Sequence, residues 1–257
     1  MKIAAWNVNS VRARAERLVD WLASRDPDIA CLQETKCEDH QFPFELVGDL
    51  GYEVTHYGQK SYNGVAILSK KRPDEVIAGF SDGAEEDASR RILWARFGTL
   101  WVASVYVPNG QSVGSDKYQY KLRWFERFTK ILASRPSDLP VIVGGDYNVA
   151  PADLDVHAPE AWRNQTLCSE PERAAFELLL AQGYTDSFRA MHPDRQAFSW
   201  WDYRMLGFQK NRGLRIDHWL MNHVAYAKCT SVEIDREARK GDDPSDHAPI
   251  ICEIDQA

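Results

Sequence analysis

The sequence predicts an α+β fold in which two mixed, mainly antiparallel β-sheets pack face to face with helices outside. Strand-like segments outnumber amphipathic helical segments by about three to one. The strands come in neighbouring groups and do not alternate strictly with helices, which argues against a doubly wound parallel sheet. The chain has 257 residues, is 44% hydrophobic and contains no linker-like or low-complexity tract. We therefore expect one domain, over residues 1–257, with a substantial core.

The N-terminal part of the chain is expected to begin with a strand, a helix and a second strand. The strands are predicted at residues 2–9 and 28–35. Ser10 is expected to cap the helix between them, and Asp26 and Pro27 stop it. Further strands are predicted at 52–57, 64–69, 91–97 and 100–107.

Two longer helices are expected in the C-terminal part of the chain. One covers roughly residues 116–134 and has one apolar face. The other runs through Leu180, because Ser169 and Glu172 form a capping box at its start and Gly183 lies at its end. The last third is strand-like again at 198–203, 215–221, 225–234 and 247–254.

Residues 141–148, with the sequence VIVGGDYN, are the most informative segment for function. An apolar run with the character of a buried strand ends in two glycines, and Asp146 and Asn148 follow two positions apart. In an extended segment such residues point to the same face, and glycine lets a ligand approach the backbone closely. The pair therefore suits a metal ion, a water nucleophile or a phosphate.

Polar residues recur at the C-terminal ends of the apolar strands. Each one alone is ordinary turn chemistry or a half-buried aromatic ring. Their presence at five strand ends predicts that they converge on one site. The set is Asn7 and Asn9, Glu34, Tyr106, Asp146 and Asn148, and Asp217.

Most of these residues offer hard oxygen ligands, and the sequence contains no cluster of cysteines that could bind a metal instead. This pattern selects Mg²⁺ or Mn²⁺ over zinc. There is no HExxH motif, and no loop with the Gly-Lys-Ser/Thr ending that nucleoside triphosphate hydrolysis requires. The candidate ligands are Glu34, Asp146, Asp246 and the amide oxygens of Asn7 or Asn148.

A second polar cluster, SDH at 245–247, lies far along the chain from the first. We expect Asp217 to orient the imidazole of His247, because a catalytic histidine needs a fixed tautomer. The competing His218 alternates with apolar residues and is expected to face the core.

The net charge and the cysteines limit which partners and which cellular compartment the sequence favours. The net charge of -7 argues weakly against a polyanionic partner, because acidic residues gathered at a metal site lower the total without repelling a phosphate elsewhere. The five cysteines form no CxxC pair, which favours reduced thiols in an intracellular protein. No signal-peptide pattern precedes the first strand and no apolar stretch is long enough for a bilayer, so we expect a cytoplasmic protein.

Seven sequence blocks occur in a fixed order: WNVN at 6–9, LQETK at 32–36, YVPNG at 106–110, GDYNVAP at 145–151, FSWWDYR at 198–204, RID at 215–217 and SDHAP at 245–249. Together they resemble the exonuclease III family of abasic-site endonucleases, within the endonuclease/exonuclease/phosphatase superfamily. The resemblance runs from residue 3 to about residue 254.

The resemblance implies a four-layer α/β sandwich with the site at one edge. It also implies a hydrolase of DNA repair that needs Mg²⁺ or Mn²⁺ and cleaves the backbone 5′ to abasic sites. A 3′-5′ exonuclease or 3′-end trimming activity can accompany this cleavage. The expected partner is double-stranded DNA with abasic sites or 3′ ends, and the expected form is a nucleoid-associated monomer of a bacterial type, with no membrane partner.

For the metal, the resemblance implies that Glu34 is the principal ligand, with Asn7 nearby and Asp246 assisting. Whether one or two ions bind stays open at this stage. A second ion would use Asp146, Asn148 and His247.

For the chemistry, the resemblance implies one role for each of five residues. Asp146 positions or deprotonates the attacking water, Asn148 holds the scissile phosphate and Tyr106 contacts it. His247, held by Asp217, stabilises charge on a phosphate oxygen.

DNA contact is expected from aromatic and basic residues in the loop that contains 200–204 and 210–213. Trp200 is expected in the core and Trp201 at the DNA. The loops 110–117 and 152–168 would border the duplex and tune endonuclease against exonuclease activity. The predicted DNA contacts are Asn9, Arg12, Asn109, Trp201, Arg204, Lys210, Arg212 and Leu214.

Two other functions fit the same pattern. An enzyme of this fold acting on another phosphoester, such as a phospholipid headgroup, is disfavoured by the aromatic and basic block from Trp200 to Arg215. A catalytically dead binding module is disfavoured by the intact polar set. Activity on lipid but not on an abasic duplex would decide for the first alternative, and a metal-dependent nicking assay tests the second.

Overall fold

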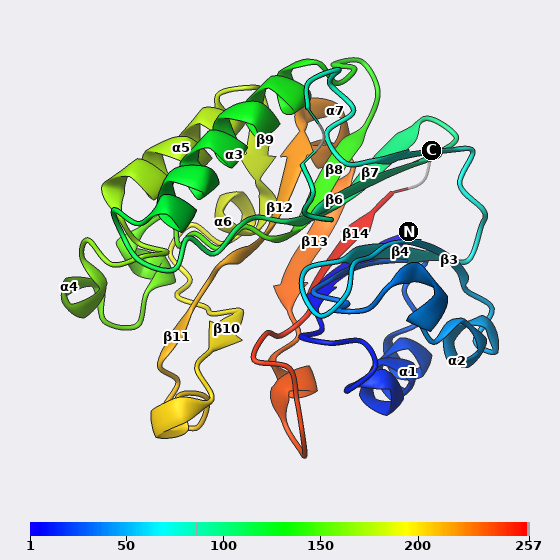
Figure 1. Ribbon diagram of the computed structural model, residues 1–257, viewed down its shortest axis with the longest axis horizontal. Coiled ribbons are helices and arrows are strands. Elements are labelled where there is room, and N and C mark those ends of the chain that lie inside the picture. Colours follow the sequence, from blue (N-terminus) through cyan, green and yellow to red (C-terminus); the bar gives the residue numbers. More distant parts are fainter. Residues whose placement is uncertain (86, 256–257) are drawn as a thin grey trace.

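The computed structural model describes residues 1–85 and 87–255, and they form two six-stranded sheets that pack face to face (Figure 1). The strand order of the first sheet is β13-β14-β1-β2-β4-β3. Only β1 and β2 are parallel, and the other neighbours pair antiparallel. Its strands are β1 (Lys2–Asn7), β2 (Ile29–Gln33), β3 (Glu53–Tyr57), β4 (Val65–Ser69), β13 (Cys229–Ile234) and β14 (Ile250–Ile254).

The second sheet has the order β5-β6-β7-β8-β12-β9. Here β7 and β8 are parallel and the other neighbours are antiparallel. The two sheets are therefore mixed and mainly antiparallel, as expected. The strands are β5 (Glu75–Ala78), β6 (Ile92–Phe97), β7 (Leu100–Tyr106), β8 (Val141–Asp146), β9 (Tyr184–Asp186) and β12 (Asp217–Asn222).

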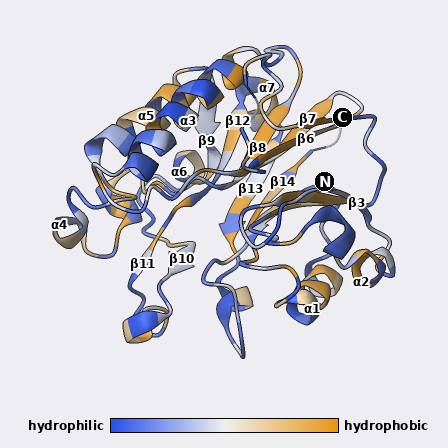
Figure 2. Cartoon of the chain, viewed as in Figure 1, coloured by the Kyte–Doolittle hydropathy of each residue, from blue (hydrophilic) through white to orange (hydrophobic). Residues whose placement is uncertain are grey.

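Three hydrophobic layers hold the helices and sheets together. Between the sheets, Ile3 and Ala5 of β1 pack in one cluster with Trp219 of β12. The intervening residues of β1 face outward and pack with helices α1 (Ala15–Arg25) and α2 (Phe44–Gly48). Helices α3 (Asp116–Ala133) and α5 (Glu170–Leu180) cover the outer face of the second sheet (Figures 1 and 2). The four-layer sandwich is thus confirmed, and Figure 2 shows the hydrophobic residues concentrated along its central strands.

Short elements connect these layers. The strands β10 and β11 form a two-stranded ribbon below the second sheet (Figure 1). Short 3₁₀ turns occur at 39–41, 153–155, 204–206 and 236–239. The remaining elements are α4 (Pro159–Trp162), α6 (Ser187–Met191), β10 (Trp200–Trp201), β11 (Gly213–Leu214) and α7 (His223–Tyr226).

The predicted start of the first helix is wrong. Asn9 and Ser10 have positive φ values of 46° and 87°, so the chain cannot enter a helix directly after them. The Ser10 hydroxyl instead accepts a hydrogen bond from the Ala13 amide in a turn, and α1 begins at Ala15. The stop at Asp26 is confirmed, since that residue is in the left-handed conformation. The capping box of Ser169 and the helix that it begins are also confirmed.

The predicted ratio of strands to helices is wrong as well. The described residues contain 14 strands and seven α-helices. Helices of four or five residues, such as α7, are too short to show a hydrophobic period, and α7 occupies the start of the strand predicted at 225–234. The edge strand β5 was missed because its side chains are mostly exposed.

The two glycines at the end of β8 have a packing reason. A Cβ atom on Gly144 would lie 2.0 Å from the Trp219 ring, and one on Gly145 would lie 2.0 Å from the Val105 carbonyl oxygen. Gly145 also has a φ of 146°. Glycine is therefore needed where β8 passes closely between its neighbours, immediately before Asp146.

Within residues 1–85 and 87–255, none of the helices combines the length and the apolar character that a bilayer crossing requires.

Candidate active site

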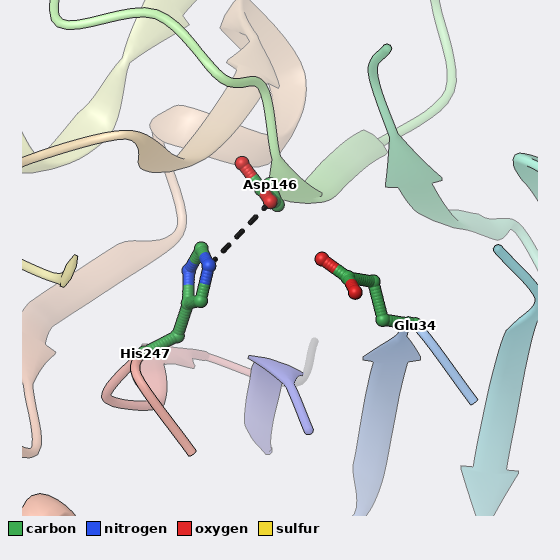
Figure 3. Close-up of side chains that lie close together, drawn as sticks. All are labelled: Glu34, Asp146 and His247. Atoms are coloured by element: carbon green, nitrogen blue, oxygen red, sulfur yellow. Dashed lines mark ion pairs between the residues drawn. The ribbon is translucent and has the colours of Figure 1, made fainter. Parts of the chain in front are cut away.

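A cluster of two carboxylates and an imidazole lies at one edge of the sandwich. Glu34, Asp146 and His247 point toward one another in Figure 3, and one ligand atom of each lies within 4.8 Å of the others. Glu34 directly follows β2, Asp146 ends β8 and His247 precedes β14. Three segments far apart in sequence thus meet where strands of both sheets end.

Strand register brings the neighbouring residues to the same edge. Tyr106 lies opposite Asp146 in the parallel pair β7–β8, and Asp217 lies opposite Asp146 in the antiparallel pair β12–β8. Backbone pairing thus places the three residues side by side, as predicted. Asp217, however, begins β12 and does not end a strand as predicted, and it reaches this edge because β12 runs antiparallel to β8.

Asn7 links the two carboxylates of the cluster. Its fully buried side chain donates from Nδ2 to Glu34 Oε1 at 2.8 Å and to Asp146 Oδ2 at 2.9 Å. The second oxygen of Glu34 accepts from Lys36 Nζ at 2.7 Å. Glu34 is therefore fixed from two sides while it stays half-buried at the mouth of the site.

His247 is held in one orientation, as predicted. Its Nδ1 lies 2.9 Å from Asp217 Oδ2, and Asp217 itself accepts from the Ser199 hydroxyl at 2.6 Å. The opposite ring nitrogen, Nε2, lies 3.7 Å from Asp146 Oδ2. An Nδ1–H directed to Asp217 leaves Nε2 facing the site.

The electrostatics of the cluster are unbalanced. Burial raises the pKa of Asp146 to about 7, and the negative charges of Asp217 and Glu34 add to this against the opposing charge of His247. Burial lowers the pKa of His247, but the charges of Asp217 and Asp146 outweigh it and raise the pKa to about 10. Three carboxylates thus face the His247 imidazolium and the Lys36 ammonium, which pairs with Glu34 at the mouth of the site, and one negative charge remains in excess.

This donor set fits a divalent cation. Glu34 and Asp146 supply two hard carboxylates around a common point, and the protonated ring of His247 lies beside them. A bound cation would neutralise the excess negative charge that burial makes costly.

Four hydrogen bonds fix the amide N–H and the side chain of Asn148. Its amide N–H donates to Asp146 Oδ1 at 2.8 Å, and its Nδ2 donates to Val107 O at 3.0 Å and to Asp146 Oδ2 at 3.2 Å. Its Oδ1 accepts from Asn109 Nδ2 at 3.0 Å. Asn148 has a φ of 51°, so its backbone is held in the sparsely populated left-handed region.

Tyr106 completes the wall of the site. Burial, together with the charges of Glu34 and Asp146, raises the pKa of its phenol well above the usual value, and the hydroxyl is hydrogen-bonded to Glu34. The Arg91 guanidinium lies over its ring, 4.7 Å from the centroid. The phenol therefore stays protonated and can donate a hydrogen bond.

Asp246 does not join the cluster of ligand atoms, although it adjoins His247. Its Oδ1 accepts from Asn9 Nδ2 and its Oδ2 from Trp200 Nε1, both at 2.9 Å. The prediction that Asp246 assists at the metal is therefore not supported by this geometry. Both oxygens instead tie the loop after β1 to the loop that carries β10.

The structure reverses the predicted roles of the two tryptophans. Trp201 is fully buried, packs edge-on against Phe208 and leaves no face for DNA, whereas Trp200 is only half-buried. Leu214 is also fully buried, in a cluster with Val156 and Trp200. The predictions that Trp201 and Leu214 contact DNA are wrong for side chains in these positions.

The other predicted DNA contacts lie at the surface. Asn9 is half-buried beside Asp246, and Arg204 is 85% exposed and paired with Asp202 at 2.6 Å. The exposed members of the set are Arg12, Asn109, Arg204, Lys210 and Arg212.

Sequence reasoning missed several residues that support the site. Lys36 sits two positions after Glu34, so its block was visible but its ion pair was not. Ser199 lies in the FSWWDYR block, but its hydrogen bond to Asp217 could not be predicted. Lys121 and Arg91 carried no signal, because each reaches the site from an element whose placement depends on tertiary packing.

Comparison with known proteins identifies the family. Residues 4–247 match the model of the endonuclease/exonuclease/phosphatase family. The Exodeoxyribonuclease III of Haemophilus influenzae is 38% identical over 267 aligned positions, which cover 99% of this chain and all of that protein. The chain therefore belongs to the endonuclease/exonuclease/phosphatase family, and the resemblance to exonuclease III is confirmed.

Two solved structures share the whole fold. A 3′ phosphatase, NExo, from Neisseria, bound to a product DNA hairpin, superposes with a TM-score of 0.96 at 39% identity, with both chains fully covered. An AP endonuclease from Archaeoglobus fulgidus has the same TM-score at 36% identity, again with full coverage of both chains. These likenesses confirm the layered sandwich.

Proposed function

We propose that this protein is a divalent-metal-dependent DNA-repair nuclease that hydrolyses the backbone 5′ to abasic sites and processes 3′ ends. The observation that carries the proposal is the convergence of Glu34, Asp146 and His247, with Asp217 behind the imidazole. Relatives that span the full chain and are named exodeoxyribonuclease III, AP endonuclease and 3′ phosphatase support the substrate class. On this proposal, residues 1–257 form one catalytic domain whose two sheets share a core.

Each residue of the cluster has a role that follows from its protonation. Asp146, with a pKa near neutral, positions the attacking water and accepts its proton. His247, whose pKa of about 10 keeps it cationic, faces the site with Nε2 and stabilises charge that develops on a phosphate oxygen. Tyr106 donates to that phosphate, and Asn148 and Asn109 hold it in place.

The metal would be held chiefly by Glu34, with Asn7 nearby, and Asn7 also ties the Glu34 carboxylate to that of Asp146. When bound, Mg²⁺ or Mn²⁺ supplies Lewis-acid stabilisation of the phosphate charge. We assign Asp246 to the linkage between the two DNA-facing loops. A second ion would draw on Asp146, Asn148 and His247.

The magnitude of the catalytic task explains why so many groups converge. Phosphodiester hydrolysis requires an acceleration of up to about 10¹⁷-fold, or roughly 23 kcal/mol of transition-state stabilisation. One general base supplies about 10²–10⁴-fold, and one oxyanion donor roughly 3–4 kcal/mol. A cation, a base and several donors acting together are therefore needed.

DNA would approach across the loops at this edge of the sandwich. The basic residues Arg12, Arg204 and Lys210 are exposed there and suit phosphate contacts. The net charge of -7 does not oppose this, because carboxylates gathered at the metal site contribute to it. We also propose that the protein acts as a cytoplasmic monomer; its five cysteines, all in the described part of the chain, are free thiols.

The test is a digest of three labelled duplexes with Mg²⁺ and with EDTA. One duplex carries a central abasic site, one carries a 3′-phosphate and one is undamaged and blunt. We expect Mg²⁺-dependent incision 5′ to the abasic site, removal of the 3′-phosphate and slower trimming of the blunt duplex. Hydrolysis of a phospholipid headgroup without any cleavage of the abasic duplex would refute the proposal, as would abasic binding without cleavage.

A further inference from the structure

A buried lysine lies directly behind the residues assigned to the phosphate. Lys121, on α3, has no exposed side-chain surface. Its Nζ donates to the carbonyl of Asn148 at 2.7 Å and to the carbonyl of Asn109 at 3.2 Å, and it forms an ion pair with Glu172. One ammonium group therefore holds two loops from different strands, β7 and β8, at the edge where the site lies.

The backbone that Lys121 holds is strained. Asn148 has a φ of 51°, and a residue other than glycine keeps such a conformation only when its surroundings fix it. The Asn148 carbonyl is bonded to Lys121, while its amide and side chain face Asp146 and Asn109. Lys121 thus binds the carbonyl of Asn148, whereas the amide and the side chain of Asn148 line the site.

Glu172 completes the arrangement from the neighbouring helix. Its Oε1 accepts from Lys121 and from the Leu167 amide, the latter at 3.0 Å. Its Oε2 accepts from the amide and the hydroxyl of Ser169, at 3.1 and 2.5 Å. The carboxylate therefore joins the start of α5 and the end of the 152–168 loop to α3.

The loop that carries Asn109 passes closely over the lysine. A Cβ atom on Gly110 would lie 3.0 Å from Lys121 Cδ, and Gly110 has a φ of 93°. Glycine at this position lets the backbone approach the lysine stem and presents the Asn109 carbonyl to Nζ.

Stability alone is a weak reason for such a pair. Burial lowers the pKa of Lys121, and the charge of Glu172 opposes that effect. Removing two ions from water is expensive, and well-packed apolar residues often stabilise a core as well or better. A charged pair at this place makes most sense if its geometry serves the loops that it binds.

We propose that Lys121 and Glu172 form a buried positioning pair that sets Asn109 and Asn148 for the scissile phosphate. Neither member reaches the substrate, so both act through the two asparagines. The inference rests on the proposed function, since it assigns these asparagines to the phosphate.

The test compares Lys121→Met, Glu172→Gln and the double variant with the wild type on the abasic duplex. Lys121→Met leaves Glu172 buried and unpaired, and we expect Tm to fall by roughly 10 °C. We expect kcat to fall by about 100-fold, because small displacements of positioning groups are costly. KM should change by less than about threefold, since the exposed cations that bind the duplex are untouched.

The double variant separates positioning from stability. It carries no buried charge and keeps a capping acceptor at residue 172, so its Tm should return close to that of the wild type. Its kcat should stay low, because the carbonyls of Asn109 and Asn148 still lack their donor. If kcat recovers together with Tm, or if Lys121→Met retains full kcat, the pair is only structural and the inference is wrong.

Two controls complete the design. Lys130→Met removes an exposed lysine from the same helix and should leave both kcat and Tm unchanged. The side-chain NH₂ resonances of Asn109 and Asn148, observed by ¹⁵N NMR, should shift in the double variant, and unchanged resonances would contradict the inference without any assay of activity. If the wild type fails to incise the abasic duplex, the proposed function fails instead, and the NMR result still tests the pair.

Discussion

Two buried charge clusters lie next to each other in this protein, and they differ in how their charge is balanced. The site cluster consists of Glu34, Asp146, Asp217 and His247. The arginine cluster consists of Asp155, Asp186, Arg189, Arg215 and His218. Both contain carboxylates and a histidine, and β12 contributes Asp217 to one and His218 to the other.

In the arginine cluster the charges are neutralised within the protein. Arg215 is fully buried and lies 2.7 Å from Asp155 and 2.8 Å from Asp186. Burial tends to raise the pKa values of both carboxyl groups, but the charge of Arg215 outweighs it and lowers them. His218 Nδ1 lies 2.9 Å from Arg215 and its Nε2 lies 2.8 Å from the Val149 carbonyl, so the ring is buried in the core, as predicted.

In the site cluster the same physics gives the opposite result. No arginine enters it, and the pKa of Asp146 rises to about 7 because burial and neighbouring carboxylates disfavour its charge. The comparison teaches that burial of carboxylates does not by itself mark an active site. An uncompensated buried charge does, because it calls for a cation and supplies a base near neutral pH.

The largest expected effect comes from Asp146→Asn. The change removes the proposed base, so kcat on the abasic duplex should fall by about 10⁴-fold. The affinity for uncleaved duplex, measured by fluorescence anisotropy, should stay within about threefold of wild type.

The matched change in the other cluster is Asp186→Asn. It should lower Tm while kcat, measured where the variant is folded, stays within a few-fold of wild type. A loss of turnover equal to that of Asp146→Asn would show that the two clusters do not have separate functions.

Arg215→Met should have the largest effect on stability. It leaves Asp155 and Asp186 buried without their cation, which costs about 3–5 kcal/mol of the free energy of unfolding. Urea denaturation measures this directly. Arg195→Met, which removes a partly exposed pair with Glu233, is the control and should cost less than about 1 kcal/mol. Equal losses for the two variants would contradict the assignment.

Metal binding should stabilise the protein through the site cluster only. At a Mg²⁺ concentration about 100 times Kd, the free energy of unfolding should rise by roughly 2.7 kcal/mol. Glu34→Gln should abolish this rise, whereas Asp186→Asn should retain it. Thermal denaturation with and without EDTA is the measurement, and a response that survives Glu34→Gln would place the ion elsewhere.

The smallest expected effect is the fall in the free energy of unfolding at acid pH. The pKa values of Asp155 and Asp186 lie below that of an unfolded aspartate, about 3.9. The stabilisation is therefore complete above about pH 4 and is lost as the pH falls through the folded-state values. Urea midpoints between pH 6 and pH 3 should fall for the wild type and fall less for Arg215→Met. If the urea midpoints of the two proteins fall equally with pH, the arginine cluster does not cause the loss of stability in acid.

Much of the site was visible in the sequence because strand ends are local features. Asp146 ends an apolar strand and Asn148 lies two positions beyond it, whereas Asp217 begins its strand. The two-residue period does not relate Asn148 to Asp146, because Asn148 lies outside the strand with a φ of 51°. The two glycines before Asp146 marked a close approach, which is made by Trp219 and Val105. The capping box at Ser169 was equally readable, since both partners lie within one turn.

What the sequence could not decide was which face of an element becomes the core. Trp200 and Trp201 must point to opposite sides of their strand, and only its pairing with β11 and the packing of Phe208 set which ring is buried. Asp246 lay beside His247 in sequence, yet Asn9 and Trp200 hold its oxygens away from the cluster.

The sequence by itself determined the elements, the polar residues at their ends and the kind of ion that those residues suit, because each depends on neighbours within a few positions. Tertiary structure alone decided which charges are compensated. Arg215 neutralises one group of carboxylates, whereas the carboxylates around Asp146 outnumber the two cations, His247 and Lys36, that face them. That outcome depends on distances between strands, which no local pattern encodes.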